Sequence, residues 1–162
     1  PTTKKWPINK FILLLKQFIN NDVRCVLLGD NGDKILADKI QLGNSNIINL
    51  LGKTSINELI NLVKYSRGII CHDSGIMHLS GALRAPTIAL IGPSNIYKIR
   101  PHAKTCQIIY LDVPCSPCLT GWTGQGWTEA ESVEKCQYNN YCMRDIPIDM
   151  VFRKANKLFQ LD

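Results

Sequence analysis

Asp73-Ser74-Gly75-Ile76-Met77-His78 is the stretch of this sequence that decides the fold. It lies between two apolar, β-prone runs at residues 68–71 and 87–91. The apolar residues that follow its small polar turn recur at the spacing of the buried stripe of a short helix. The sequence therefore predicts a strand, a tight turn and a helix start, followed by a second strand.

The turn in this stretch has the chemistry of an anion site. A helix that starts directly after a strand aims backbone N–H groups at a ligand. Ser74 suits a helix cap, and Gly75 allows a close approach to the backbone. His78 follows Ser74 by four residues and so lies on the same face, one turn further along. We predict a phosphate-binding turn with an imidazole beside it.

Outside this stretch, strand and helix patterns alternate up to about residue 111. Strands are expected at residues 23–28, 47–50, 68–71 and 87–91. Helices are expected at residues 8–19, 33–40 and 55–65, after Ser74, and at residues 147–160 as a terminal helix. The third of these begins with a capping-box pattern, Ser55 with Glu58. The alternation predicts an α/β fold with right-handed crossovers and a doubly wound parallel sheet.

Three loops mark the carboxyl ends of the expected strands, at residues 29–33, 52–54 and 73–78. Ligands of doubly wound sheets bind beyond these ends. We therefore expect the three loops to form one continuous rim around a ligand.

Size and charge narrow the class of protein. With 162 residues and 45% hydrophobic content, the chain can build one sizeable core. No apolar run approaches the roughly 20 residues of a membrane-spanning helix. The net charge of +6 favours anionic partners, namely nucleotides, nucleic acid or an acidic membrane surface. The sequence starts at Pro1 in what is expected to be a loop, so we expect an excised domain.

Residues 112–143 form an irregular, cysteine-rich excursion. It holds four of the seven cysteines: Cys115, Cys118, Cys136 and Cys142. The first pair has the two-residue spacing of a zinc site, whereas the second pair is wider than usual. Structural zinc, disulfides and free thiols all remain open. Catalytic zinc is not expected, because no histidine lies among these ligands. Cys25 and Cys71 lie in expected strands and are interpreted as small core residues.

Several motifs run in order through nearly the whole chain. They are Lys4-x-Trp6-Pro7, Leu28-Gly29-x3-Asp33, Asn49-Leu50-x-Gly52-Lys53-Thr54-Ser55-x2-Glu58-Leu59, and Asp73-Ser74-Gly75-x2-His78-Leu79 with Ala85-Pro86 and Ile91-Gly92-Pro93-Ser94 after it. Cys142-Met143-Arg144-Asp145-Ile146 follows them. Together they resemble the C-terminal half of the ADP-heptose:lipopolysaccharide heptosyltransferases, glycosyltransferase family 9. The resemblance implies a GT-B fold of two Rossmann-like domains, of which residues 1–162 are the donor-binding one.

The resemblance also implies roles for the turn. Ser74, Gly75 and His78 would contact the donor diphosphate. Asp73 would orient the loop and reach the sugar hydroxyls. Lys4 would neutralise the leaving diphosphate. On this reading Lys4, Asp73 and His78 are the catalytic residues, and neither a metal nor a cofactor is needed.

Further binding residues follow from the same resemblance. Thr2 and Thr3 would lie near the donor phosphates, and Asp33 would bind the adenosine ribose. The loop of Gly52, Lys53 and Thr54 would line the adenine.

Structural readings of four of these residues stay open beside the functional ones. Asp73 could cap the helix, and His78 could be a buried core histidine. Lys4 could be an exposed terminal lysine, and Asp33 a helix N-terminal charge.

The expected function is heptose transfer from ADP-heptose to the lipopolysaccharide inner core by an inverting mechanism. The N-terminal acceptor domain, which supplies the general base in this family, has no match in the sequence. We therefore expect the chain to bind donor without transferring sugar. The expected location is the cytoplasmic face of the inner membrane, with peripheral contact to anionic lipid and no nucleic-acid partner. The alternatives are a donor with another nucleotide, such as UDP or GDP, and a zinc-bearing nucleic-acid module.

Overall fold

The computed structural model describes residues 2–30, 33, 40, 45–119, 131 and 136–161. The helices are η1 (Thr2–Lys4, a 3-10 turn), α1 (Ile8–Asn20), α3 (Ile56–Tyr65), α4 (Gly75–Ala82), α5 (Ile96–Ile99), α7 (Tyr141–Arg144) and α8 (Ile148–Phe159). The strands are β1 (Cys25–Leu27), β2 (Ile47–Asn49), β3 (Ile69–His72), β4 (Thr87–Leu90) and β5 (Cys106–Ile109).

Every pair of neighbouring strands in the described residues is parallel. β1 pairs with β2, and Cys25 lies opposite Ile47. β4 lies between β3 and β5 in a second ladder, in which Ile88 is opposite both Ile70 and Gln107. Helices α3 and α4 connect consecutive elements of this alternation. The predicted parallel α/β fold is confirmed.

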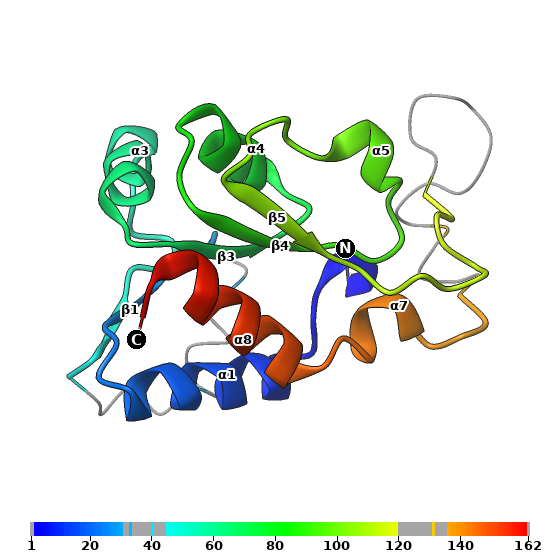
Figure 1. The fold of residues 1–162 in the computed structure, drawn as a ribbon, viewed down its shortest axis with the longest axis horizontal. Helices are drawn as coiled ribbons and strands as arrows, with labels where there is room; N and C mark the ends of the chain where they lie inside the picture. Colours follow the sequence, from blue (N-terminus) through cyan, green and yellow to red (C-terminus); the bar gives the residue numbers. More distant parts are fainter. Residues whose placement is uncertain are drawn as a thin grey trace.

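Side chains of β4 alternate between two apolar cores, one on each face of the sheet. Ile88 and Leu90 pack with the cluster built mainly by α1 and α8. Ala89, together with Ile91 directly after the strand, packs with the cluster built by α3 and α4. Figure 1 shows α3, α4 and α5 on one side of β3–β4–β5 and the adjoining pair α1 and α8 on the other. Because both faces are covered, the whole of β4 is buried, as central strands of doubly wound sheets are.

Local signals set the helix starts. Ser55 and Glu58 close the expected capping box of α3: the Ser55 N–H donates to the Glu58 carboxylate at 2.7 Å, and the Glu58 N–H donates to the Ser55 hydroxyl at 3.3 Å. Pro7 and Pro147 immediately precede α1 and α8, where their missing N–H groups are not needed by the helix. The terminal helix is therefore confirmed close to its predicted bounds.

Three short elements after β4 are not predicted by the sequence. β5 spans four residues, too few for an alternating pattern to show, and only Ile109 among them is buried. α5 and α7 each span four residues, too few for a helical period to show. The expected helix at residues 33–40 lies outside the described residues apart from its two ends. In the parts of the chain that the structure describes, no helix is both long and apolar enough to cross a membrane.

Candidate functional site

Lys4 and Asp73 form an ion pair at the carboxyl end of β3. Nζ of Lys4 lies 2.9 Å from Oδ2 of Asp73, and the two side chains are only 21% and 10% exposed. The hydroxyl of Ser94, which follows β4, donates to the same oxygen at 2.6 Å. The N-cap position of α4 is Ser74, so the helix-cap reading of Asp73 is wrong. Lys4 is likewise held in place and is not a loose terminal lysine.

The start of α4 is open beside this ion pair. Ser74, Gly75 and His78 are all exposed, so the reading of His78 as a core histidine is wrong. The Ser74 side chain makes no capping bond to the helix and donates instead to the His72 carbonyl at 3.3 Å. A Cβ atom added at Gly75 would meet no atom within 4 Å. Nothing in the described protein therefore fills the space in front of Gly75, as expected of a ligand site.

The first two loops of the predicted rim are joined to each other. The Gly52 N–H donates to the Gly29 carbonyl at 2.9 Å, and Gly52 has a left-handed φ of 63°, which favours glycine. A Cβ atom at Gly29 would lie 2.7 Å from Oδ2 of Asp33, so a larger residue there would force the Asp33 side chain to shift. Gly52 and Lys53 are exposed and Thr54 is half-buried.

Lys5 connects this pair of loops to the N-terminal segment. Its Nζ lies 2.7 Å from Oδ1 of Asp33. This hydrogen bond to Lys5 lowers the pKa of the Asp33 carboxyl. Since Lys4 reaches the loop after β3 and Lys5 the loop after β1, two consecutive lysines link both ladders at their carboxyl ends. The helix that Asp33 would open lies outside the described residues.

His72 anchors the backbone between these contacts and α1. The Trp6 N–H donates to its Nε2 at 3.0 Å, and the ring lies edge-on to Phe11 at 5.2 Å between centroids. Burial, with a smaller effect of the Lys5 charge, lowers the pKa of His72 to about 4. The imidazole is therefore neutral at pH 7 and serves as an acceptor.

Sequence reasoning missed three residues of the site: Lys5, His72 and Ser94. The signal for Ser94 is its place after β4, because β4 lies beside β3 and the two strands end at one edge. The signal for His72 is weaker, since a histidine at a strand end is equally consistent with a surface position. Lys5 lies between the motif residues Lys4 and Trp6 and belongs to no motif, so the sequence carries no signal for it.

The two threonines lie in η1, immediately before Lys4. Thr3 is buried, with 6% of its surface exposed. It lines a pocket together with Pro93 and the excursion cysteines. Thr2 begins the same 3-10 turn.

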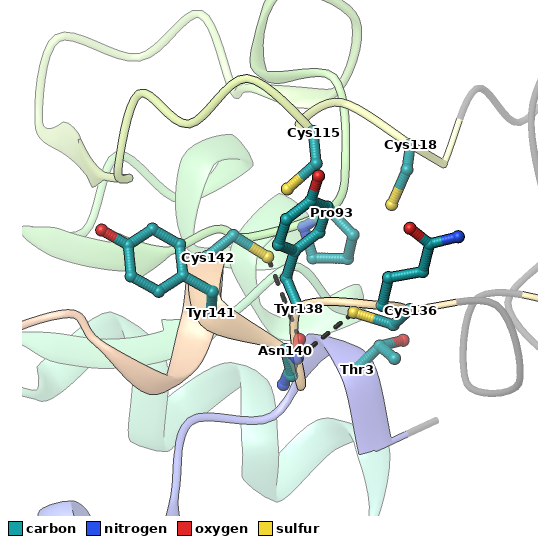
Figure 2. A pocket seen from close by; sticks show the side chains of 10 residues that line it. Thr3, Pro93, Cys115, Cys118, Cys136, Tyr138, Asn140, Tyr141 and Cys142 are labelled. Carbon is teal, nitrogen blue, oxygen red and sulfur yellow. Dashed lines mark hydrogen bonds between the residues drawn. The ribbon is translucent and has the colours of Figure 1, made fainter.

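The excursion cysteines line one pocket of about 250 Å³, shown in Figure 2. All seven cysteines of the chain are in described positions, and none of them is joined to another by a disulfide. Burial and then the three neighbouring thiols raise the pKa of Cys142 to about 11. Cys71 is buried among the α3–α4 core, and Cys25 packs partly buried against the opposite core. The core interpretation of these two is confirmed.

The described geometry suits a bound diphosphate. A lysine, a helix N-terminus and an exposed histidine lie around open space at the carboxyl end of a parallel sheet. Backbone N–H groups and cations are the groups that stabilise phosphate oxygens.

The family model and the most similar relatives point to the same family. The model of glycosyltransferase family 9 (heptosyltransferase) matches residues 2–123. Lipooligosaccharide heptosyltransferase 2 of Haemophilus ducreyi is 34% identical over 115 residues, which are 67% of this chain and 33% of that protein. Lipopolysaccharide heptosyltransferase 2 of Escherichia coli K12 is 32% identical over 132 residues, 78% of this chain and 38% of that protein.

Solved structures agree on the fold. The structure of E. coli ADP-heptose lps heptosyltransferase II superposes with a TM-score of 0.74 at 26% identity, covering 98% of this chain and 43% of that one. E. coli heptosyltransferase WaaC with ADP gives a TM-score of 0.71 at 16% identity over 98% of this chain and 41% of that one. The present chain thus spans less than half the length of the relatives that it matches.

Proposed function

The chain belongs to glycosyltransferase family 9, the heptosyltransferases, and on this basis we propose that it is the donor-binding half of an inverting glycosyltransferase. The proposed reaction moves heptose from ADP-heptose to the lipopolysaccharide inner core. The names of the relatives support the acceptor and the sugar, and the solved complex of a structural neighbour with ADP supports the nucleotide. Membership of a glycosyltransferase family argues against the nucleic-acid module.

The observation that carries this proposal is the Lys4–Asp73 ion pair beside the open start of α4. Transfer of the sugar releases a nucleoside diphosphate, on which negative charge develops in the transition state. A lysine fixed in advance by Asp73 stabilises that charge without a reorganisation cost.

The phosphate end of the donor is assigned to the turn and its flanking segment. Ser74, Gly75 and His78 are all exposed at the start of α4 and would contact the two phosphates. The exposed imidazole of His78 adds an N–H donor. Asp73, already bound to Lys4 and Ser94, would orient this loop and reach the sugar hydroxyls with its remaining acceptor capacity.

The nucleoside end is assigned to the two loops joined by Gly29 and Gly52. Asp33 would bind the ribose while Lys5 holds its carboxylate. Gly52, Lys53 and Thr54 would line the adenine. Thr2 and Thr3 would lie near the phosphates, and because Thr3 is buried, a phosphate contact is left to its backbone.

The remaining parts of the reaction are proposed to lie on the other half of a two-domain enzyme. The general base that activates the acceptor hydroxyl would come from that other half, so this half would bind donor without transferring sugar alone. We place the enzyme at the cytoplasmic face of the inner membrane, as a peripheral protein. The net charge of +6 supports attraction to anionic lipid and to phosphorylated core sugars.

Nucleotide binding by the purified chain tests the proposal. Isothermal titration and thermal shift with ADP, UDP and GDP should show binding that is strongest for ADP. Lys4→Ala should weaken ADP binding about tenfold or more, as expected for loss of a charge-assisted contact. Lys16→Ala is the matched control, because Lys16 is exposed on α1 outside the three loops. Absence of binding by all three nucleotides would contradict the proposal, and a preference for UDP or GDP would change the donor.

A further inference from the structure

The pocket between the excursion and η1 has an unusual wall of four thiols. Cys115 and Cys118 come from the segment after β5, whereas Cys136 precedes α7 and Cys142 lies in that helix. Figure 2 shows all four sulfur atoms pointing toward the space between the two segments. The other lining residues carry no carboxylate and no imidazole.

The first pair of cysteines is fixed by bonds to the loop after β4. The Ser116 hydroxyl donates to the Gly92 carbonyl at 2.7 Å. The N–H groups of Cys118 and Leu119 both donate to the Pro93 carbonyl, at 3.0 and 2.9 Å. This spacing of two residues between thiols is the one found in structural zinc sites.

The second pair has a wider spacing, and the backbone explains how both thiols still reach the pocket. Asn139 and Asn140 adopt left-handed φ values of 47° and 56°, which reverse the chain before α7 begins. The Asn140 N–H then donates to the sulfur of Cys136 at 3.2 Å. This hydrogen bond holds the Cys136 side chain at the pocket, beside the turn that leads to Cys142.

From these observations we propose that the pocket is a structural site for a thiophilic divalent cation, with Zn²⁺ as the preferred ion and Cys115, Cys118, Cys136 and Cys142 as its ligands. Binding exchanges four thiol protons for one cation: Zn²⁺ plus four R–SH gives Zn(SR)₄²⁻ plus four H⁺. Four thiolates fill a tetrahedral shell, which leaves no open position for catalysis. The ion would join the segment after β5 to α7.

The described side chains are close to this arrangement but do not yet form it. Among the described residues, no three His, Cys, Asp or Glu side chains are grouped tightly enough to hold a metal. Ligation therefore requires the cysteine side chains to rotate between staggered rotamers and draw their sulfurs inward.

Zinc titration of the reduced, metal-free chain tests this inference independently of nucleotide binding. We expect about one zinc retained per chain after gel filtration, measured by mass spectrometry of the metal. Zinc should also protect about four of the seven thiols from a thiol reagent, whereas Mg²⁺ should protect none. Cobalt in place of zinc should give the visible absorption bands of tetrahedral thiolate ligation.

Single substitutions separate this pocket from the other cysteines. Cys118→Ser should reduce zinc affinity at least tenfold, whereas Cys106→Ser, a change in β5 outside the pocket, should leave it unchanged. If Cys118→Ser does not fold, the cobalt spectrum and thiol protection of the unaltered chain still decide. Failure to retain zinc, or recovery of the four cysteines as two disulfides in the protein purified without reductant, would overturn the proposal.

Discussion

The backbone N–H of Trp6 donates a 3.0 Å hydrogen bond to Nε2 of His72, a residue 66 positions later in the chain. This bond fixes the segment in which Lys4 and Lys5 precede Trp6. Lys4 then meets Asp73 and Lys5 meets Asp33. A neutral histidine in the sheet thus holds the cationic side of the candidate site in place.

Replacing His72 by leucine should destabilise the fold. The Trp6 N–H would lose its acceptor in a partly buried place, which costs about 1–3 kcal/mol. Urea unfolding of His72→Leu should show this loss in the free energy of unfolding. His102→Leu is the control, because His102 is exposed, and its stability should stay within about 0.5 kcal/mol of the unaltered chain. Equal stability of both variants would contradict the anchoring role of His72.

The pH dependence of stability should also depend on His72. Its pKa in the folded chain is about 4, below the ordinary value of 6.5, so the unfolded chain binds more protons between these values. The contribution of neutral His72 to the free energy of unfolding is complete above about pH 6.5. It is lost as the pH falls toward 4, by up to about 3 kcal/mol. In His72→Gln, which keeps an acceptor but does not titrate, the fall in unfolding free energy over this window should be smaller. Parallel pH profiles for the two proteins would show that another group is responsible.

Lys4 and Asp73 should show energetic coupling. A double-mutant cycle with Lys4→Met and Asp73→Asn, measured by urea unfolding, should give an interaction free energy of about 0.5–3 kcal/mol. The reason is that each single change leaves one partner of a partly buried ion pair without its counter-charge. Strict additivity of the two changes would mean that the pair does not persist in solution.

Gly75→Ala should separate folding from ligand binding. A Cβ atom there meets no protein atom within 4 Å. The free energy of unfolding should therefore stay the same or rise by up to about 1 kcal/mol. The methyl group would instead occupy the space proposed for phosphate, and ADP affinity should fall about tenfold in a titration. Unchanged ADP affinity would mean that the phosphates do not bind at this turn.

Gly92→Ala is the comparison variant, because a Cβ atom at Gly92 meets packed side chains instead of open space. Its Cβ atom would lie 2.4 Å from Cγ of Met143, so thermal stability should fall clearly. Together the two variants show whether the open space at Gly75 is particular to the site.

Local patterns in the sequence account for most of the described elements. The capping box of Ser55 and Glu58, the alternation of apolar runs with helical periods, and the Ser74–Gly75 turn involve residues within one or two helical turns of one another. Such patterns report the backbone hydrogen bonds and buried faces that each segment forms, and they predicted the parallel α/β fold. The short β5, α5 and α7 carry too few residues for the same kind of signal.

The contacts of the candidate site cannot be predicted from such local patterns. The sequence placed Lys4, Asp33 and Asp73 in motifs, yet which lysine meets which aspartate depends on how the strands are ordered and where the N-terminal segment crosses their ends. The convergence of four cysteines on one pocket likewise depends on how the segment after β5 meets α7 and the residues before it. The sequence by itself determined most of the described elements and predicted an anion-binding turn at Asp73–His78, because both follow from neighbouring residues. Only the tertiary structure decided the partners, because His72, Lys5 and Ser94 reach the site across long separations in the chain that crossovers of a parallel sheet bring together.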